Sequence, residues 1–166
     1  MLMEDAATHI LSTGSGWGFG VACADVNGDG RDDLIIGQAE IQFGPYVSDY
    51  AVNIIYGVGG MLPGLMDDTD ADAVLSVDLG APSGIGELQG GSVAAADVSG
   101  DGMAEIIVDQ NEGNTAHGES AIWVIAGDEY AGEYALDELA YAVIADFQGD
   151  TITSMVDDGH RYIVGQ

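Results

Sequence analysis

The feature that most constrains this chain is an internal repeat. The stretch GFGVACADVNGDGRDDLIIG, residues 18–37, returns 72 residues later as GGSVAAADVSGDGMAEIIVD, residues 90–109. A weaker third copy at residues 150–166 keeps an Asp-Gly step and closes on IVGQ, as the first copy closes on IIGQ. Similarity over so long a period predicts an array of structural units that bury their apolar faces against one another.

Short apolar runs between turn residues predict that these units consist of β-strands. The 166 residues include 26 glycines but only 3 prolines, and runs of Val, Ile and Ala lie between the glycines. Segment 60–72 is expected to be an irregular surface connection, and aromatic and leucine residues at helical spacing predict one short helix within 128–140. The expected strands are residues 9–12, 19–24, 33–37, 51–56, 73–79, 91–96, 105–108, 121–126, 142–147, 151–156 and 161–164.

The predicted fold class is all-β, with the strands arranged as β-propeller blades. About four strands fall in each repeat, and four antiparallel strands make up one blade. A single region, 1–166, then holds repeats near 9–72 and 73–141 and a partial third repeat near 142–166, or about two and a half blades. Because propellers typically close with about four to eight blades, this set is incomplete. Completion by a longer chain, completion by another subunit, and an open array with exposed edge strands are all compatible with the sequence.

The charge of the chain is strongly one-sided. It carries 29 acidic residues against Arg31 and Arg161, with no lysine, for a formal net charge of −27. This charge excludes nucleic acid as a partner and predicts that bound cations or concentrated salt support the fold. The composition is similar to that of proteins from salt-loving organisms. No apolar run approaches the ~20 residues that span a bilayer, and the first residues, MLMEDAATHI, do not read as a signal sequence.

Two acidic loops carry the strongest functional signal, and both predict calcium binding. Oxygen ligands at alternate positions suit a loop wrapped around a hard cation, with a backbone carbonyl at position 7. Several carboxylates within nine residues also repel one another unless an ion relieves the repulsion. The expected ligands of the first loop are Asp25, Asn27, Asp29, the carbonyl of Arg31, and Asp33. Those of the second loop are Asp97, Ser99, Asp101, the carbonyl of Met103, and Glu105.

The first loop is the more complete of the two predicted calcium sites. The third copy keeps Asp157 and Asp158 but has Tyr162 near the place of the last carboxylate, so no ion is expected there. The plain alternative for the loops is an Asp-Gly hairpin turn with solvated carboxylates. The string DVNGDG also opens EF-hand and dockerin loops, but a helix follows those loops, whereas the β-branched runs DLIIG and EIIVD follow here and predict strands.

Together these features resemble the FG-GAP repeat, the blade unit of integrin alpha-subunit propellers and of many microbial surface proteins. Gly18-Phe19-Gly20 supplies the FG element and the loop beginning at Asp25 the acidic motif, while the second copy has Gly90-Gly91-Ser92 in place of Phe-Gly. The resemblance implies a Ca²⁺ on the hairpin of each intact blade, ligand contacts made by other loops, and an extracellular or cell-surface location.

No catalytic arrangement is expected. His117 lies near Ser120 and two glutamates, Glu112 and Glu119, from which a hydrolytic trio could be built, but no nucleophile-elbow pattern accompanies them. GSGWGFG, residues 14–20, leads into a strand rather than opening a helix, which disfavours phosphate binding. The lone cysteine, Cys23, is expected to be a small buried side chain. The aromatic residues Trp17, Phe19 and Trp123 are expected to pack between blades.

These observations predict a calcium-stabilised, non-catalytic binding or adhesion scaffold outside the cell. The alternative is a structural subunit of a surface filament, sheath or virion-like assembly, which self-assembles through the incomplete blades. A third hypothesis is a non-catalytic part of a larger secreted hydrolase. The sequence holds no Arg-Gly-Asp motif, glycosylation sequon or basic patch, so it names no protein or glycan ligand.

Overall fold

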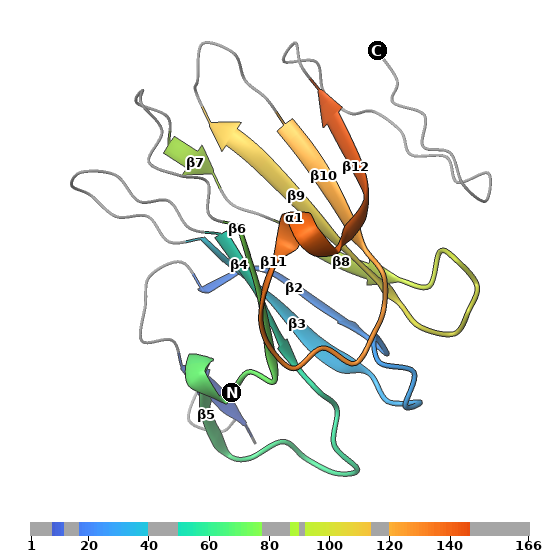
Figure 1. Cartoon of the computed structure of the whole chain (residues 1–166). Helices are drawn as coiled ribbons and strands as arrows, with labels where there is room; N and C mark the ends of the chain where they lie inside the picture. The colour runs from blue at the N-terminus through green and yellow to red at the C-terminus, as the bar shows by residue number, and fades with distance from the viewer. Residues whose placement is uncertain are drawn as a thin grey trace.

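The protein is all-β in the part of the chain that its computed structural model describes, which confirms the predicted class. The described residues are 8–11, 17–39, 50–77, 87–89, 92–113 and 120–146. They form two five-stranded sheets, one two-stranded sheet, the single 3-10 turn Asp68–Asp70 and the four-residue helix α1, Leu136–Leu139 (Figure 1). The strands are β1 His9–Leu11, β2 Trp17–Ala24, β3 Asp33–Ala39, β4 Tyr50–Ile55, β5 Leu65–Asp67, β6 Ala73–Val77, β7 Glu87–Gln89, β8 Val93–Ala96, β9 Glu105–Gly113, β10 Ser120–Ile125, β11 Gly132–Ala135 and β12 Ala140–Asp146.

The first sheet has the order β11-β6-β4-β3-β2, and its strands β2, β3, β4 and β6 are antiparallel neighbours. Side chains alternate between its two faces, so the adjacent residues Ile35 and Ile36 of β3 belong to different apolar clusters. The same holds for Ile54 and Ile55 of β4. Both faces of this sheet are therefore covered, which explains the continuous apolar runs in its sequence.

The second sheet repeats this arrangement. Its order is β12-β10-β9, with the short strands β7 and β8 both pairing with β9. The first hairpins of the two sheets have the same register, since Ala24 pairs with Asp33 in one and Ala96 with Glu105 in the other. The internal sequence repeat thus corresponds to two sheets of the same strand order.

The first nine predicted strands correspond to observed strands, but β5, β7 and β11 were not predicted. Segment 60–72 is less irregular than expected, because it contains β5 and the 3-10 turn. The helix predicted within 128–140 is limited to α1, and β11 precedes it. The strands predicted at 151–156 and 161–164 lie outside the described residues. Within the described ranges, no helix has the length and apolar character needed to cross a membrane.

One apolar core joins the two large sheets. It combines side chains of β3, β4 and β6 with side chains of β8, β9 and β10. The sheets approach most closely where β2 passes β8: a Cβ added at Gly20 would lie 2.6 Å from the backbone nitrogen of Val93. No side chain fits there without a backbone shift, which explains why the last residue of the Gly-Phe-Gly element, at position 20, is a glycine.

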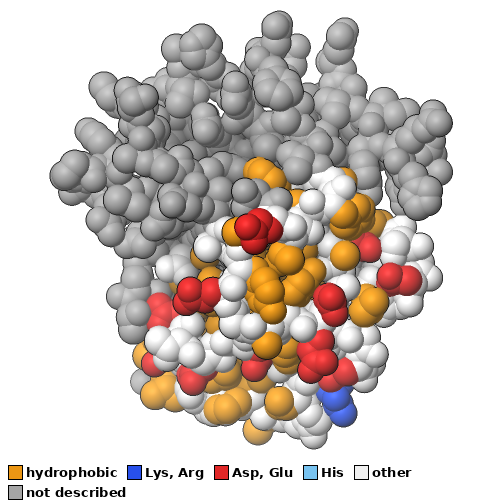
Figure 2. Space-filling view, in the orientation of Figure 1, with side chains coloured by type: hydrophobic (Ala, Val, Ile, Leu, Met, Phe, Trp, Pro, Cys, Tyr) orange, Lys and Arg blue, Asp and Glu red, His pale blue; other side chains and the backbone are white. Residues whose placement is uncertain are grey.

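A second, smaller cluster covers the outer face of the first sheet. It contains Ile36, Ile55 and Met66, and Trp17 packs against it rather than between the two large sheets. Trp123, by contrast, packs against the shared core, while the side chain of Phe19 is not among those described. On the face shown in Figure 2, the acidic side chains of the described residues lie at several separate places among apolar and uncharged groups.

Cys23 is exposed, so the prediction of a buried cysteine was wrong. Its neighbours Ala22 and Ala24 pack against the shared core, which turns Cys23 to the outer face of the edge strand β2. There it lines a cavity of about 330 Å³ together with Leu34, Ile55 and other residues. Ile55 and Leu34 belong to or pack against the second cluster, so this cluster borders Cys23 without burying it.

Hydrogen bonds from the partly buried Tyr56 and the buried Tyr130 connect segments of the two repeats. The hydroxyl of Tyr56, which follows β4, donates a hydrogen bond to the carbonyl of Tyr130 at 2.9 Å. The hydroxyl of Tyr130 donates in turn to the carbonyl of Ala126 at 2.8 Å, and its ring lies edge-on to that of Tyr134 with centroids 5.6 Å apart. Burial raises the pKa of both Tyr56 and Tyr130 from 10.0 to about 12.

These pKa shifts predict a loss of stability in alkali. Because the folded-state pKa of each tyrosine lies above 10.0, the unfolded chain releases its protons first, and the free energy of unfolding falls as pH rises from 10.0 to about 12. Tyrosinate absorbance of the folded protein should show Tyr56 and Tyr130 ionising late. Tyr130→Phe should remove one late step, and a folded protein whose tyrosines all ionise near pH 10 contradicts the prediction.

Candidate functional site

The two predicted calcium loops occupy the same position in both sheets. One connects β2 to β3 and the other connects β8 to β9. Each has two glycines with positive φ at matching places, Gly28 and Gly30 at 75° and 81°, and Gly100 and Gly102 at 79° and 95°. A side chain would strain this left-handed backbone, so the spacing of these glycines fixes the path of both loops.

The first aspartate of each loop organises the turn. One carboxylate oxygen of Asp25 accepts the N–H of Gly28 at 2.7 Å, and the other accepts the N–H of Gly30, also at 2.7 Å. Asp97 makes the same two contacts with Gly100 and Gly102, at 2.6 and 3.0 Å. The side chain of position 1 thus points into its own loop in both copies.

The last acidic residue of each loop is buried. Asp33 has an exposed fraction of 0%, and its two oxygens accept the N–H groups of Val26 at 2.9 Å and Gly57 at 2.8 Å. Glu105, 2% exposed, accepts the N–H groups of Val98 at 2.8 Å and Ser99 at 3.3 Å through one oxygen. Both carboxylates accept backbone N–H groups, and that of Val26, which Asp33 accepts, is buried.

Burial also affects the titration of Asp33. Removal of this carboxyl from water raises its pKa, the N–H donors of Gly57 and Val26 lower it, and the nearby charges of Asp25 and Asp29 raise it further. The net direction is upward, so the charged form is disfavoured in the folded protein. A cation close to these three carboxylates would relieve this repulsion.

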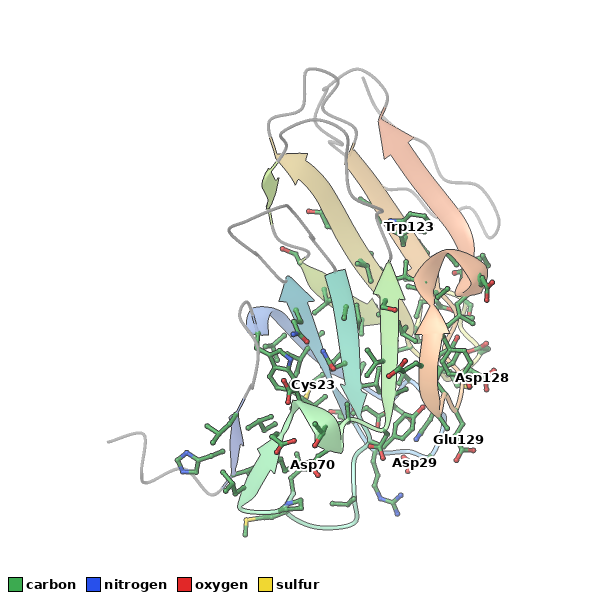
Figure 3. All side chains as sticks on the ribbon, turned by 60° about the vertical axis from the view of Figure 1, so that its left-hand side comes forward. Cys23, Asp29, Asp70, Trp123, Asp128 and Glu129 are labelled. Atoms are coloured by element: carbon green, nitrogen blue, oxygen red, sulfur yellow. The ribbon has the colours of Figure 1, made fainter. Side chains whose placement is uncertain are left out.

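The middle positions of the loops are more exposed. Asn27 accepts the N–H of Asp29 at 3.0 Å through its side-chain oxygen. Asp29, which is labelled in Figure 3, accepts the N–H of Arg31 at 2.9 Å and forms an ion pair with its guanidinium at 2.7 Å. In the second loop, Asp101 accepts the N–H of Met103 at 2.9 Å. Because Met103 carries no charge, the second loop has no equivalent of this ion pair.

The predicted metal ligands of both loops suit a hard cation such as calcium, since the ligand atoms are all oxygens. Among the described residues, however, no three His, Cys, Asp or Glu side chains converge as a metal-binding group. The carboxylates are instead directed to backbone N–H groups, although an oxygen that accepts one N–H keeps a second lone pair. The loops therefore have suitable ligands for calcium, and binding requires the exposed carboxylates to turn toward a common point.

The two loops also contact each other, which the sequence did not reveal. The N–H of Ala104, at the end of the second loop, donates to the carbonyl of Asp25 at 2.7 Å. Met103 lies against Gly28, where an added Cβ would come within 3.0 Å of its side chain. Gly127 passes so close that a Cβ there would lie 2.7 Å from Cβ of Met103 and 2.8 Å from the carbonyl oxygen of Val26. The first loop is thus part of the junction between the sheets.

Sequence reasoning missed the close contacts that Gly57 and Gly127 make with the two loops. A Cβ at Gly57 would lie 2.4 Å from the carbonyl oxygen of Asp32, so this glycine presses against the first loop as Gly127 presses against the second. Both end matching segments, AVNIIYG and AIWVIAG. That shared final glycine is the sequence signal that could have indicated a close backbone approach.

The remaining candidate residues lie beyond what the structure describes. Of the hydrolytic trio around His117, residues 114–119 are outside the described ranges, and the side chains of Glu112 and Ser120 are not described. Asp157 and Asp158 of the third copy lie outside as well. Comparison with family models, with curated proteins and with solved structures found no match to this chain.

The buried contacts of Asp33 predict a large loss of stability on its removal. Asp33→Ala leaves the N–H groups of Val26 and Gly57 without their acceptor, which should lower the free energy of unfolding by about 2 kcal/mol or more. Asp32→Ala removes the same charge from an exposed neighbour and should change it by less than about 0.5 kcal/mol. Urea unfolding of both variants at equal salt measures the difference, and equal losses would refute the role of Asp33.

Proposed function

We propose that this chain is a calcium-stabilised, non-catalytic binding or adhesion scaffold of the FG-GAP propeller type that acts outside the cell. The observation that supports this most is the recurrence of one acidic loop at the same strand junction of two sheets with the same order and register. A plain hairpin turn does not require three acidic positions and two left-handed glycines to recur together.

Electrostatics favours a cation at these loops. The protein has a formal net charge of −27, and self-repulsion of this size opposes a compact state. Asp33 is buried near Asp25 and Asp29; burial is the main cause of its raised pKa, and the charges of these two residues raise the pKa further. Calcium bound by the first loop would reduce this repulsion.

The position of the first loop favours a scaffolding role for that cation. The carbonyl of Asp25 holds the start of β9, so an ion that rigidifies this loop also rigidifies the contact between the sheets. The four antiparallel strands β2, β3, β4 and β6 agree with the content of a propeller blade. The adjacent apolar cavity, which Arg31, Val58 and Leu62 also line, is a candidate contact point for a ligand.

The second candidate function is a structural subunit of a surface filament or sheath. A specific observation favours it: among the described residues, β12 is an edge strand that pairs on one side only. Such an edge is a template for pairing with another chain.

The test of the proposed function is thermal unfolding in concentrated salt, with calcium and with a chelator. Calcium at about 100 times its dissociation constant should add about 2.7 kcal/mol, or roughly 5–10 °C in melting temperature. Asp29→Asn and Asp101→Asn should each reduce this gain, and Asp32→Asn, which removes one charge outside the ligand set, should preserve it. A melting temperature that calcium does not change would mean that the loops are acidic turns only.

A further inference from the structure

Two parallel strand pairs interrupt an otherwise antiparallel structure. β5 pairs in parallel with β1, from His9 opposite Leu65 to Leu11 opposite Asp67. β11 pairs in parallel with β6 over four residues. Parallel strands are not joined by a tight hairpin, so each pair needs a separate explanation from the hairpins that make up the two large sheets.

The two parallel pairs occupy the same place in the repeat. β5 lies in the connection from β4 to β6, and β11 lies in the matching connection from β10 to β12. Each of these connecting strands pairs with a strand that comes before the hairpin of its own acidic loop: β5 with β1, which precedes β2, and β11 with β6, which precedes β7 and β8. Since β6 is the last antiparallel strand of the first sheet, β1 stands where the last such strand of a preceding sheet would stand.

The outer edge of β12 is the counterpart of the β6 edge that holds β11. Both are last strands, and both pair on their inner side with the third strand of their sheet: Ile54 lies opposite Ala73, and Val124 lies opposite Ala142. β6 carries β11 on its outer side, whereas no described strand pairs with the outer side of β12. This edge presents a row of N–H and C=O groups.

The opposite end of the molecule is incompletely covered. Around the β1–β5 pair, Leu11, Met61 and Leu65 are 56%, 79% and 66% exposed. Around the β6–β11 pair, by contrast, Tyr130 and Leu136 are buried in the shared core. β5 and β12 lie at opposite ends of the described part of the protein (Figures 1 and 3), so one end offers an edge to which no described strand is paired and the other offers exposed apolar side chains.

We infer that β12 of one copy pairs in parallel with β5 of a second copy, in the place that the three-residue strand β1 occupies within a single chain. Ala142 is the counterpart of Ala73, which lies opposite the first residue of β11, and Leu65 is the first residue of β5. The same register therefore places Ala142 of one copy opposite Leu65 of the next. The contact joins two different surfaces, so each added copy leaves one of each for further growth into a ring or a fibre. This joint extends beyond the proposed function because it does not involve the acidic loops.

Cysteine cross-linking of the full chain tests this register directly. The variant carries Leu65→Cys and Ala142→Cys together with Cys23→Ser, and it is oxidised in concentrated salt with calcium so that charge repulsion is screened. A ladder of disulfide-linked dimers, trimers and larger species is expected. The matched control places Val21→Cys, also strongly exposed, with Ala142→Cys, and it should give at most a weak ladder. Equal ladders from both variants would overturn the joint.

Sedimentation equilibrium of uncross-linked protein provides the second test. Leu65→Glu would bring an unpaired carboxylate into the joint and should weaken self-association by about tenfold or more, whereas Val21→Glu, with the same charge change, should not. A protein that stays monomeric, including one whose own residues beyond 146 cover β12, overturns the inference. If its melting temperature still rises with calcium, the proposed function stands without the joint.

Discussion

The rest of the structure depends on one constraint, which is that the two large sheets bury their apolar inner faces against each other. Each sheet has an apolar inner face, and the shared core draws on Ile35 and Ile54 of one and Ile106 and Val108 of the other. Burial of this kind is the main favourable term in folding, so neither sheet is expected to be stable alone. The glycine at position 20 is part of the same constraint, because it lets β2 pass against β8.

The acidic loops act on this junction rather than apart from it. Asp33 and Glu105 are buried acidic residues at the first positions of β3 and β9, and each accepts two backbone N–H groups. The carbonyl of Asp25 links the first loop to the second sheet. Stability and cation affinity are therefore expected to be coupled through the same few residues, since any change that reorients the loops also alters the contact between sheets.

The candidate site could be located from the sequence, but the roles of its members could not. The alternation of oxygen-bearing residues and the paired glycines identified both loops, because loop conformation depends on residues close in sequence. Which carboxylate is buried depends on a partner elsewhere, and the N–H of Gly57 reaches Asp33 only after β3 and β4 have paired. The contact between Ala104 and Asp25 likewise requires both sheets to be in place.

The sequence by itself determined the all-β class, nine of the strands and the long period of the repeat. These features are local, since alternating apolar residues and turn-forming glycines act over a few positions. Only the tertiary structure decided β5, β7 and β11, because strands of three or four residues exist through the partners they pair with. It also decided that Cys23 is exposed, since its own alternating pattern cannot show how far a neighbouring segment covers the outer face of β2.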